Sequence, residues 1–504
     1  MYYKNTLLIS LVSYSVIFNS VNGDREPPSV IIIGAGAAGI AAASKLFQNG
    51  FTNITILEAE ERIGGRLYTT QFGGYLVDLG GQWVHGEIGN VAYELAFPLG
   101  LLEKDYFTNR IQELYDSSGT LVDQRMTNDI LEFYMQISQK NFTEKLNVSI
   151  GELATNELNK YLEAHPDWKK NSKGVLQMFE MDQLAIDGAD SWFDVSISGT
   201  SEFYHSPGDT DINWKERAYG FILDILMKRY PRPEEELPVV KNTLLNTEVA
   251  LINNKDTSGK KVAVTTINGN TYFADHAIVT TSLGVLKEQH LSLFQPSLSE
   301  EKIKAIKALG FGSEAKIFLS FEEPWWTIEA TRSGLYFLWK DEDIVQLEND
   351  PEKSWLLGLL GFYFVEHKPR LLCGWVSGKH ARDMEKLTEQ QVFNHTVEAL
   401  QRFVGEYYNV TMPNGMTRSM WNSNKHFKGT YSYRSMKADA DNVWHATLAE
   451  PIGGRNPVIL FAGEATNPHY FGTVNGAIAS GWREADRLIQ FYSNLEKVNG
   501  STPS

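Results

Sequence analysis

Three glycines near the start of the chain have the spacing of a dinucleotide-binding turn. Gly34, Gly36 and Gly39 follow a short apolar run and open an alanine-rich segment. In such a turn the first glycine permits a tight bend, the second admits a diphosphate to the backbone, and the third lets helix and strand pack closely. Glu58 ends the next apolar run, where a carboxylate can accept both ribose hydroxyls of an adenosine. The pattern favours a dinucleotide site over a purely structural turn.

A second glycine turn follows, and it ends in a cation. Gly64 and Gly65 precede Arg66, whose guanidinium can pair with a diphosphate. Two such elements in succession favour FAD over NAD as the ligand.

The elements that must position these residues follow from the apolar patterns. We expect a strand over 29–33, a helix to about Asn49 and a strand over 54–57, which together form a βαβ unit of a parallel sheet. Helical periodicity dominates residues 106–169. Further strands are expected near 239–251, 262–267, 271–273, 277–281, 316–321, 371–376 and 458–462, with a hairpin turn at 268–269 and helices over 301–309 and 475–493.

The order of these elements predicts a fold that combines α/β and α+β parts. A discontinuous Rossmann-like FAD-binding domain is expected over 29–104, 217–300 and 415–493. A substrate-binding domain of mixed sheet and helices is expected over 105–216 and 301–414, with a flexible tail at 494–504.

The net charge of −16 argues against a nucleic acid partner, because phosphate binding needs clustered lysine and arginine. A cationic substrate is compatible with this charge, although an acidic surface also serves solubility alone. The single cysteine, Cys373, excludes an internal disulfide and is expected to be buried and inert. No metal ion is expected.

The first residues resemble a secretory leader. Lys4 precedes an apolar run over 7–18, and Val21 and Gly23 occupy the small positions of a cleavage site. Residues 1–23 are therefore predicted to be a signal peptide of a secreted protein, with an apolar run too short for a stable membrane anchor. Six Asn-X-Ser/Thr sites fit this route: Asn53, Asn141, Asn147, Asn394, Asn409 and Asn499.

The run from Val30 to Arg66 resembles the FAD signature of the flavin-containing amine oxidase superfamily. Three later segments repeat the resemblance, at 80–86 (GGQWVHG), 282–287 (SLGVLK) and 461–466 (FAGEAT). Within the superfamily, the segments at 421–424 and 428–433 are most similar to the polyamine oxidase branch. Monoamine oxidases attach their flavin through a cysteine before the last helix, and this chain has none there, which implies noncovalent FAD.

The resemblance implies a set of cofactor-binding residues. It places Glu464 at the flavin ribityl chain, Val249 at the adenine, and Thr473 where the last helix approaches both the flavin ring and the substrate. With the glycine turns, the cofactor-binding set is Gly34, Gly36, Gly39, Glu58, Arg66, Gly81, Gln82, Trp83, Val249, Trp421, Glu464 and Thr473.

Other residues are implied in catalysis and substrate binding. Lys316 matches the family lysine that holds a water near flavin N5; the alternative is a strand-edge lysine that reaches solvent. His85 matches a residue at the substrate amine, and a structural histidine is the alternative reading. Tyr431 and Tyr433 would form aromatic walls with Trp83 and Trp421. Asp187 and Asp190 would attract distal amines, or are ordinary surface acids. Asn475 stands where the family usually has histidine, which makes substrate selectivity less transferable than cofactor binding.

These expectations combine into FAD-dependent oxidation of a small cationic amine. Spermine, spermidine or their N1-acetylated forms would transfer a hydride to the flavin, with molecular oxygen as the acceptor. The products would be a shorter amine, an aminoaldehyde and hydrogen peroxide, and activity would rise with pH above neutrality. The alternatives are a secreted L-amino-acid oxidase, which needs an arginine for the substrate carboxylate, a histone demethylase, and an inactive secreted flavin-binding protein.

Overall fold

The computed structural model describes residues 27–104, 113–138, 147–165, 169, 171–255, 259–326 and 334–500. The predicted signal peptide and the glycosylation site at Asn141 lie outside these residues.

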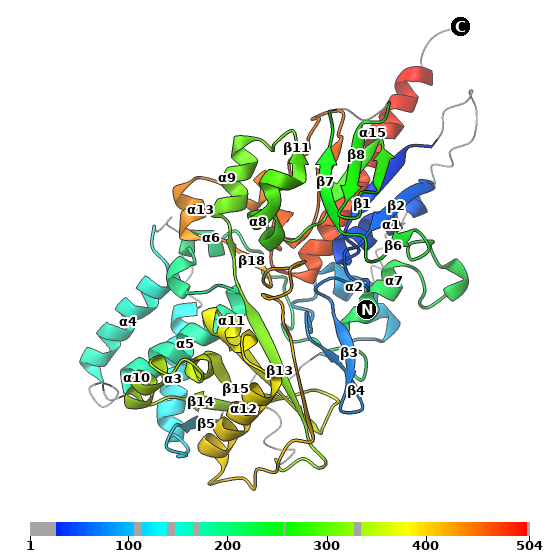
Figure 1. The fold of residues 1–504 in the computed structure, drawn as a ribbon. Coiled ribbons are helices and arrows are strands. Elements are labelled where there is room, and N and C mark those ends of the chain that lie inside the picture. The colour runs from blue at the N-terminus through cyan, green and yellow to red at the C-terminus, as the bar shows by residue number, and fades with distance from the viewer. Residues whose placement is uncertain are drawn as a thin grey trace, which may run out of the picture.

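A five-stranded parallel sheet forms the upper part of the molecule in Figure 1. Its order is β19 (Ile459–Phe461), β10 (His276–Val279), β1 (Ser29–Ile33), β2 (Asn53–Leu57) and β6 (Thr243–Leu244). All four strand pairings are parallel. The central strand β1 is buried at every position, as expected for an apolar strand covered on both faces. Segments far apart in the chain therefore build one sheet.

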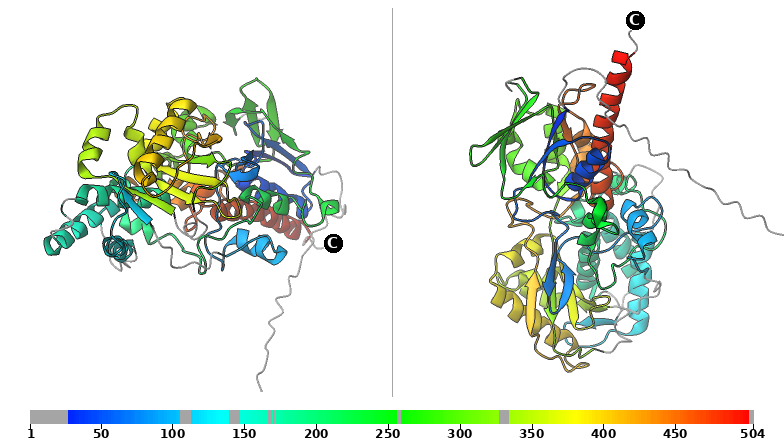
Figure 2. Two further views of the ribbon diagram at one scale, coloured as in Figure 1. Left: turned by 90° about the horizontal axis from the view of Figure 1, so that it is seen from below. Right: turned by 90° about the vertical axis from the view of Figure 1, so that its right-hand side faces the viewer.

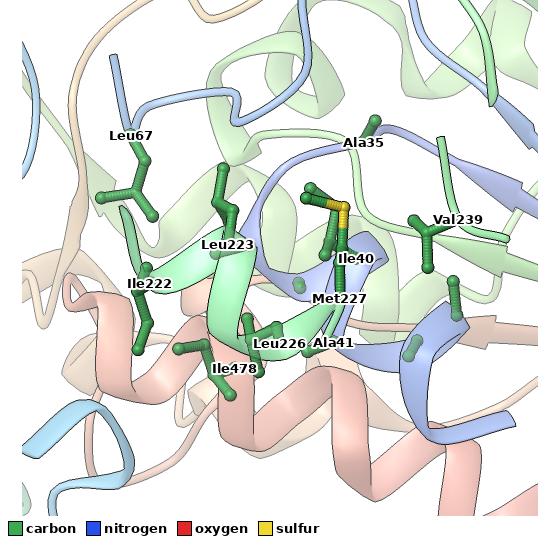
Figure 3. Close-up of a cluster of buried hydrophobic side chains, with 14 of the residues drawn as sticks. Ala35, Ile40, Ala41, Leu67, Ile222, Leu223, Leu226, Met227, Val239 and Ile478 are labelled. Carbon is green, nitrogen blue, oxygen red and sulfur yellow. The ribbon is translucent and has the colours of Figure 1, made fainter. Parts of the chain in front are cut away.

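Helices α1 (Ala37–Gln48), α7 (Ile222–Leu226) and α15 (Val474–Gly500) pack beside this sheet. Small residues let α1 and α15 approach closely, since a Cβ on Gly481 would lie 2.2 Å from the carbonyl oxygen of Ala38. Figure 3 shows Ile40, Leu226 and Ile478 of the three helices in one apolar cluster. Helix α15 runs to Gly500 rather than Ser493, so the tail predicted from residue 494 is helical as far as Gly500.

A four-stranded sheet lies next to the parallel sheet. Its order is β11 (Phe294–Gln295), β7 (Val249–Asn253), β8 (Val262–Thr266) and β9 (Thr271–Ala274). The predicted hairpin turn joins β8 to β9, and Gly269 there has a φ of 82° that favours glycine. Helices α8 (Leu283–Leu293) and α9 (Glu300–Ala308) pack against the same apolar cluster as these strands.

A six-stranded mixed sheet forms the core of the lower part of Figure 1. Its order is β17 (Gly415–Arg418), β13 (Glu314–Ser320), β16 (Leu371–Ser377), β15 (Leu359–Phe364), β14 (Gly334–Leu338) and β5 (Glu113–Asp116). One prediction is corrected here. Strand β5 lies in the region where helical periodicity was predicted to dominate, and it was missed because four residues are too few to show their period beside longer helical patterns. Strand β17, at the start of the range predicted as the last part of the cofactor domain, pairs with β13 of this sheet.

Helices surround the six-stranded sheet, and α5 (Ser172–Asp187) packs directly on β14, β15 and β16. Figures 1 and 2 show most of the others around this part of the molecule. They are α3 (Gln124–Ser138), α4 (Ile150–Ala164), α10 (Asp341–Glu348), α11 (Lys379–Glu385) and α12 (Glu389–Val404). The remaining short elements are α2 (Val91–Ala96), α6 (Ile197–Thr200), α13 (Met436–Ala440), α14 (His445–Ala449), the pair β3 (Thr69–Phe72) with β4 (Tyr75–Asp78), and the pair β12 (Gly310–Phe311) with β18 (Ser432–Tyr433).

The combination of helices with several kinds of sheet agrees with the predicted fold class. The exact domain limits stay a prediction. Within the described ranges, no helix is both long enough and apolar enough to cross a lipid bilayer.

Candidate active site

A cavity of about 1240 Å³ extends from the carboxyl ends of β1 and β2 to the walls formed by β13, β15 and β16. The predicted site residues, with the exception of Gly39 and Asp190, line it. They are Gly34, Gly36, Glu58, Arg66, Gly81, Gln82, Trp83, His85, Asp187, Val249, Lys316, Trp421, Tyr431, Tyr433, Glu464 and Thr473. Residues that the sequence separates by up to 439 positions, Gly34 and Thr473, thus face one space.

The two glycine turns lie side by side at one end of this cavity, which we call the glycine end. Gly36 forms a bridge with Gly64, and the Gly64 amide donates to the carbonyl oxygen of Ala35 at 2.8 Å. Gly34 has a φ of 104°, and a Cβ there would lie 2.4 Å from Thr280 Oγ1. Gly36 is the N-cap of α1 and has no side chain to cap the helix. The helix amides that face the cavity can therefore receive a diphosphate, and the turn fits a dinucleotide.

Gly39 lies behind the turn instead of on the cavity wall. A Cβ at this position would lie 2.0 Å from the carbonyl oxygen of Gly34 and 3.3 Å from Ile32 Cγ2. Its position accords with the packing role predicted for the third glycine.

Glu58 directly follows β2, lies beside the first turn and is 6% exposed. Its Oε2 accepts the Ala35 amide at 2.6 Å, and its Oε1 accepts the Glu60 amide at 2.8 Å. Burial raises the pKa of Glu58 above its ordinary value, against the effect of these two backbone amides. Each oxygen keeps a second lone pair with which to accept a hydroxyl.

Arg66 and Glu464 form an ion pair that joins the second glycine turn to the segment before the last helix. Arg66 Nη1 lies 2.9 Å from Glu464 Oε1. Glu464 Oε2 accepts the Ser432 hydroxyl at 2.6 Å and the Gly472 amide at 2.8 Å. Burial alone would raise the pKa of Glu464, but the Arg66 charge and the hydrogen bonds from Ser432, Arg66 and Gly472 hold it below the ordinary value. This carboxylate is fixed in place and charged.

Val249 begins β7 and lines the cavity near the glycine end. The preceding Glu248 accepts Lys425 Nζ at 2.6 Å and contacts His426 Nε2 at 3.1 Å. His426 Nδ1 in turn lies 2.5 Å from Glu60 Oε1. A paired charge network thus closes this end of the cavity.

Lys316 lies on β13 and is 4% exposed. Its Nζ donates to the carbonyl oxygens of Asp78 at 3.1 Å and Gly80 at 2.7 Å, and to Gln82 Oε1 at 2.8 Å. Burial lowers the pKa of Lys316 to about 8. The lysine therefore lies inside the cavity wall, not at a solvent-exposed strand edge, and it fixes the segment from Gly80 to Gln82.

Aromatic side chains form the wall around Lys316. Trp83 stacks on Trp375 with ring centroids 5.9 Å apart, and Tyr363 lies 5.3 Å from Trp83. The Nζ of Lys316 lies 5.0 Å from the centroid of the Trp375 ring, within the range of a cation–π contact. Trp421 is held by its indole N–H, which donates to the carbonyl oxygen of Leu79 at 2.9 Å.

His85 is exposed to the cavity, and its Nδ1 lies 2.5 Å from the carbonyl oxygen of Thr210. Because a carbonyl can only accept, this contact places the ring proton on Nδ1 and makes Nε2 the acceptor of the neutral imidazole.

Thr473 caps α15, since its Oγ1 accepts the Gly476 amide at 2.9 Å. Asn475, at the position of the family histidine, accepts the Val91 amide at 3.0 Å and so ties α15 to α2.

The opposite end of the cavity carries carboxyl groups, and we call it the acidic end. Asp187 closes α5, and its Oδ2 accepts Gln183 Nε2 at 2.7 Å. Burial raises the pKa of Asp187 to about 6. Tyr431 lies beside it and donates to the carbonyl oxygen of Ala185 at 2.5 Å. Asp190 does not line the cavity; it pairs with Arg382.

Glu314, Tyr363 and Trp375 are among the residues of the cavity wall that were not predicted from the sequence. Glu314 precedes Lys316 by two positions and therefore shares its strand face. An acidic residue at this position of an apolar strand was a signal from which its place in the cavity wall could have been predicted. Trp375 comes opposite Lys316 through strand pairing, and Tyr363 lies on the next strand. Pairing between distant strands leaves no local signal for these two aromatic residues.

Within the ranges that the structure covers, no group of three or more His, Cys, Asp or Glu side chains could hold a metal ion. Cys373 is 0% exposed on β16, outside the cavity wall, and burial raises the pKa of its thiol to about 12.

Comparison with known proteins identifies the family. A family model described as flavin containing amine oxidoreductase matches residues 37–489. The chain is 30% identical to the human peroxisomal N(1)-acetyl-spermine/spermidine oxidase, over 92% of this chain and 96% of that protein. The bovine protein of the same name is 29% identical over 92% of this chain and 95% of its own length. Probable polyamine oxidase 5 of Arabidopsis thaliana is 25% identical over 92% and 98%, respectively. The chain therefore belongs to the family of flavin-containing amine oxidoreductases.

Proposed function

We propose that this protein is an FAD-dependent polyamine oxidase that acts on spermine, spermidine or their N1-acetylated forms. One observation carries the proposal: a single cavity joins the glycine end to the acidic end, and Lys316 lies in its wall. The relatives named as N(1)-acetyl-spermine/spermidine oxidase and probable polyamine oxidase support the same substrate class.

FAD is the cofactor, as the family of flavin-containing enzymes implies. When bound, it accepts a hydride from the carbon beside the substrate nitrogen and is reoxidised by oxygen, with release of hydrogen peroxide. We propose a Rossmann-like cofactor domain, because the glycine turn follows the central strand of a parallel sheet and opens α1. Noncovalent attachment is supported by the position of Cys373, which is buried away from the cavity.

The protein's own groups bind and orient the amine. Nε2 of His85 accepts a hydrogen bond from the amine, and the deprotonated form of the reacting nitrogen is selected, so activity rises with pH above neutrality. Trp83 and Trp375, which stack on each other, present an apolar wall to the methylene chain. Lys316 holds Gly80 and Gln82 in one arrangement beside the reacting carbon. Water then hydrolyses the oxidised carbon–nitrogen bond to give an aminoaldehyde and a shorter amine.

The charges of the cavity match a cation better than an amino acid. Beyond the glycine end, its acidic lining residues are Glu103, Asp182, Asp187, Asp211, Glu314 and Glu366. An L-amino-acid oxidase needs an arginine for the substrate carboxylate. Of the described lining residues, Arg66 and Arg434 are the arginines, and they pair with Glu464 and Asp439 at 2.9 and 2.7 Å.

Purified protein tests the proposal directly. We expect a yellow protein that releases FAD on denaturation and produces peroxide with spermine or N1-acetylspermine, but not with leucine or phenylalanine. Peroxide from leucine alone would assign the chain to the L-amino-acid oxidases. A protein with bound FAD that oxidises none of these compounds would be a flavin-binding protein without this activity.

Secretion remains a second proposal, supported by the apolar run at 7–18 and the small residues after it. Mass spectrometry of the protein recovered from the medium of expressing cells should show a mature chain that begins near Asp24. Retention of the protein in the cells with an uncleaved N-terminus would contradict it.

A further inference from the structure

Glu314 is a buried acid with unused hydrogen-bonding capacity. It begins β13, lines the cavity and is 4% exposed. Its Oε2 accepts the Ser377 hydroxyl at 2.8 Å, whereas its Oε1 has no hydrogen-bond partner within the described part of the chain. A buried carboxyl oxygen without a partner is costly, which points to a ligand that supplies the missing donor.

Glu314 and Asp187 lie near the same aromatic ring. Burial raises the pKa of Tyr431 well above its ordinary value, and the charges of Glu314 and Asp187 raise it further. The ring packs against the end of α5, since a Cβ on Gly188 would lie 2.4 Å from Tyr431 Cε2. The start of β13 and the end of α5 thus both lie near the Tyr431 ring, so each places a carboxyl group at the acidic end.

We propose that Glu314 binds a free terminal ammonium group of the polyamine at the acidic end, so that it selects free amines over N-acetylated ones. The inference rests on the proposed function and specifies its substrate. Glu314 and Lys316 are two residues apart on one face of a strand, a separation of about 7 Å. An ammonium group bound by Glu314 would therefore lie within the length of one spermine molecule from the Lys316 side chain.

The selectivity follows from charge. An ammonium group offers three N–H donors and a positive charge, which offset the cost of holding the Glu314 carboxylate away from water. Burial raises the pKa of Glu314 well above its ordinary value, and a bound ammonium would reverse this shift. An acetylated nitrogen is an uncharged amide, so it gains no such attraction and brings the added bulk of its acetyl group.

The test compares wild type with Glu314→Gln, which keeps the size of the side chain and removes its charge. Substrates are spermine and spermine acetylated on both terminal nitrogens. We expect kcat/KM for spermine to fall about 10–100-fold, as for a lost charged hydrogen bond, and kcat/KM for the diacetylated form to change less than about 3-fold. Equal losses for both substrates, or no loss for either, would overturn the inference.

Two controls separate selectivity from damage. Glu180→Gln changes an acid on α5 that does not line the cavity, and it should leave the substrate ratio unchanged. A linear α,ω-diaminoalkane and its diacetylated form, used as competitive inhibitors, report binding without turnover; only the free diamine should bind more weakly to Glu314→Gln. A wild-type protein that oxidises no polyamine would refute the proposed function, whereas an active wild type with an unchanged ratio in Glu314→Gln would refute this inference alone.

Discussion

Glu58 and Glu464, at the glycine end of the cavity, accept hydrogen bonds on both carboxylate oxygens, whereas Glu314, at the acidic end, has one oxygen without a partner among the described residues. The glycine end also pairs its charges, as in Arg66 with Glu464. The comparison teaches that one cavity can serve two ligands in different ways. The groups that would bind the resident cofactor are already held by hydrogen bonds. The carboxyl group that would bind the cationic substrate gains its missing hydrogen-bond partner only when the substrate binds.

The largest expected effect comes from breaking the ion pair at the glycine end. Arg66→Met leaves Glu464 buried and charged, which should lower the free energy of unfolding by about 3–5 kcal/mol and reduce FAD content. Denaturant unfolding and flavin absorbance measure the two effects. Lys173→Met is the matched control, because its pair with Glu348 has the same 2.9 Å distance but is exposed, and it should cost less than about 1 kcal/mol. Similar losses in both variants would show that the buried pair has no special role.

A second prediction tests whether Lys316, which lies between the two ends of the cavity, positions the segment from Gly80 to Gln82 for the reaction. Lys316→Met frees Gly80 and Gln82, and a shift of this segment should lower kcat about 100-fold while FAD stays bound. Stopped-flow measurement of flavin reduction with spermine provides the rate. Lys302→Met removes another buried lysine, one whose Nζ donates to the carbonyl oxygens of Thr447 and Leu448 outside the large cavity, and should spare kcat. A comparable loss in Lys302→Met would reduce Lys316 to a packing role.

A third prediction concerns the stability cost of the acidic end. Burial raises the pKa of Asp187 from 3.8 to about 6, so the folded state binds more protons than the unfolded state between these values, and stability falls as pH rises through this window. Asp187→Asn removes this loss. We therefore expect the variant to be more stable than wild type by about 3 kcal/mol at pH 7 and to show no such gain below pH 4. Unfolding curves at the two pH values measure this, and an equal difference at both would exclude an ionisation effect.

The smallest expected effect lies at the cap of the last helix. Thr473→Ala removes the acceptor of the Gly476 amide and should cost about 1 kcal/mol, while Thr473→Ser should retain most of the stability. Thermal unfolding with and without bound FAD measures both. If Ser and Ala behave alike, the hydroxyl does not stabilise the helix.

The glycine end was largely predictable because its residues lie close together in the chain. Gly34, Gly36, Glu58 and Arg66 fall within 33 residues, where spacing alone reports the turn chemistry. Resemblance to the family then supplied Glu464, Lys316 and the aromatic walls. The acidic end was only partly predictable. Glu314 shares the strand face of Lys316 and so had a local signal, whereas Trp375 faces the cavity through the register of β13 with β16, and the partner of a strand is not encoded in its local pattern. The same reason explains why the pairing of residues 415–418 with β13 was not predicted.

The strand order of the parallel sheet also constrains how the protein is made. Its edge strand β19 and the carboxylate of Glu464 come from the last tenth of the chain, while Arg66 comes from the first seventh. A nascent chain cannot complete this sheet until residues 459–464 have been synthesised. We therefore expect full FAD loading to require this segment, and a premature stop before residue 459 would leave the early glycine turns without the wall that Glu464 adds to the cavity.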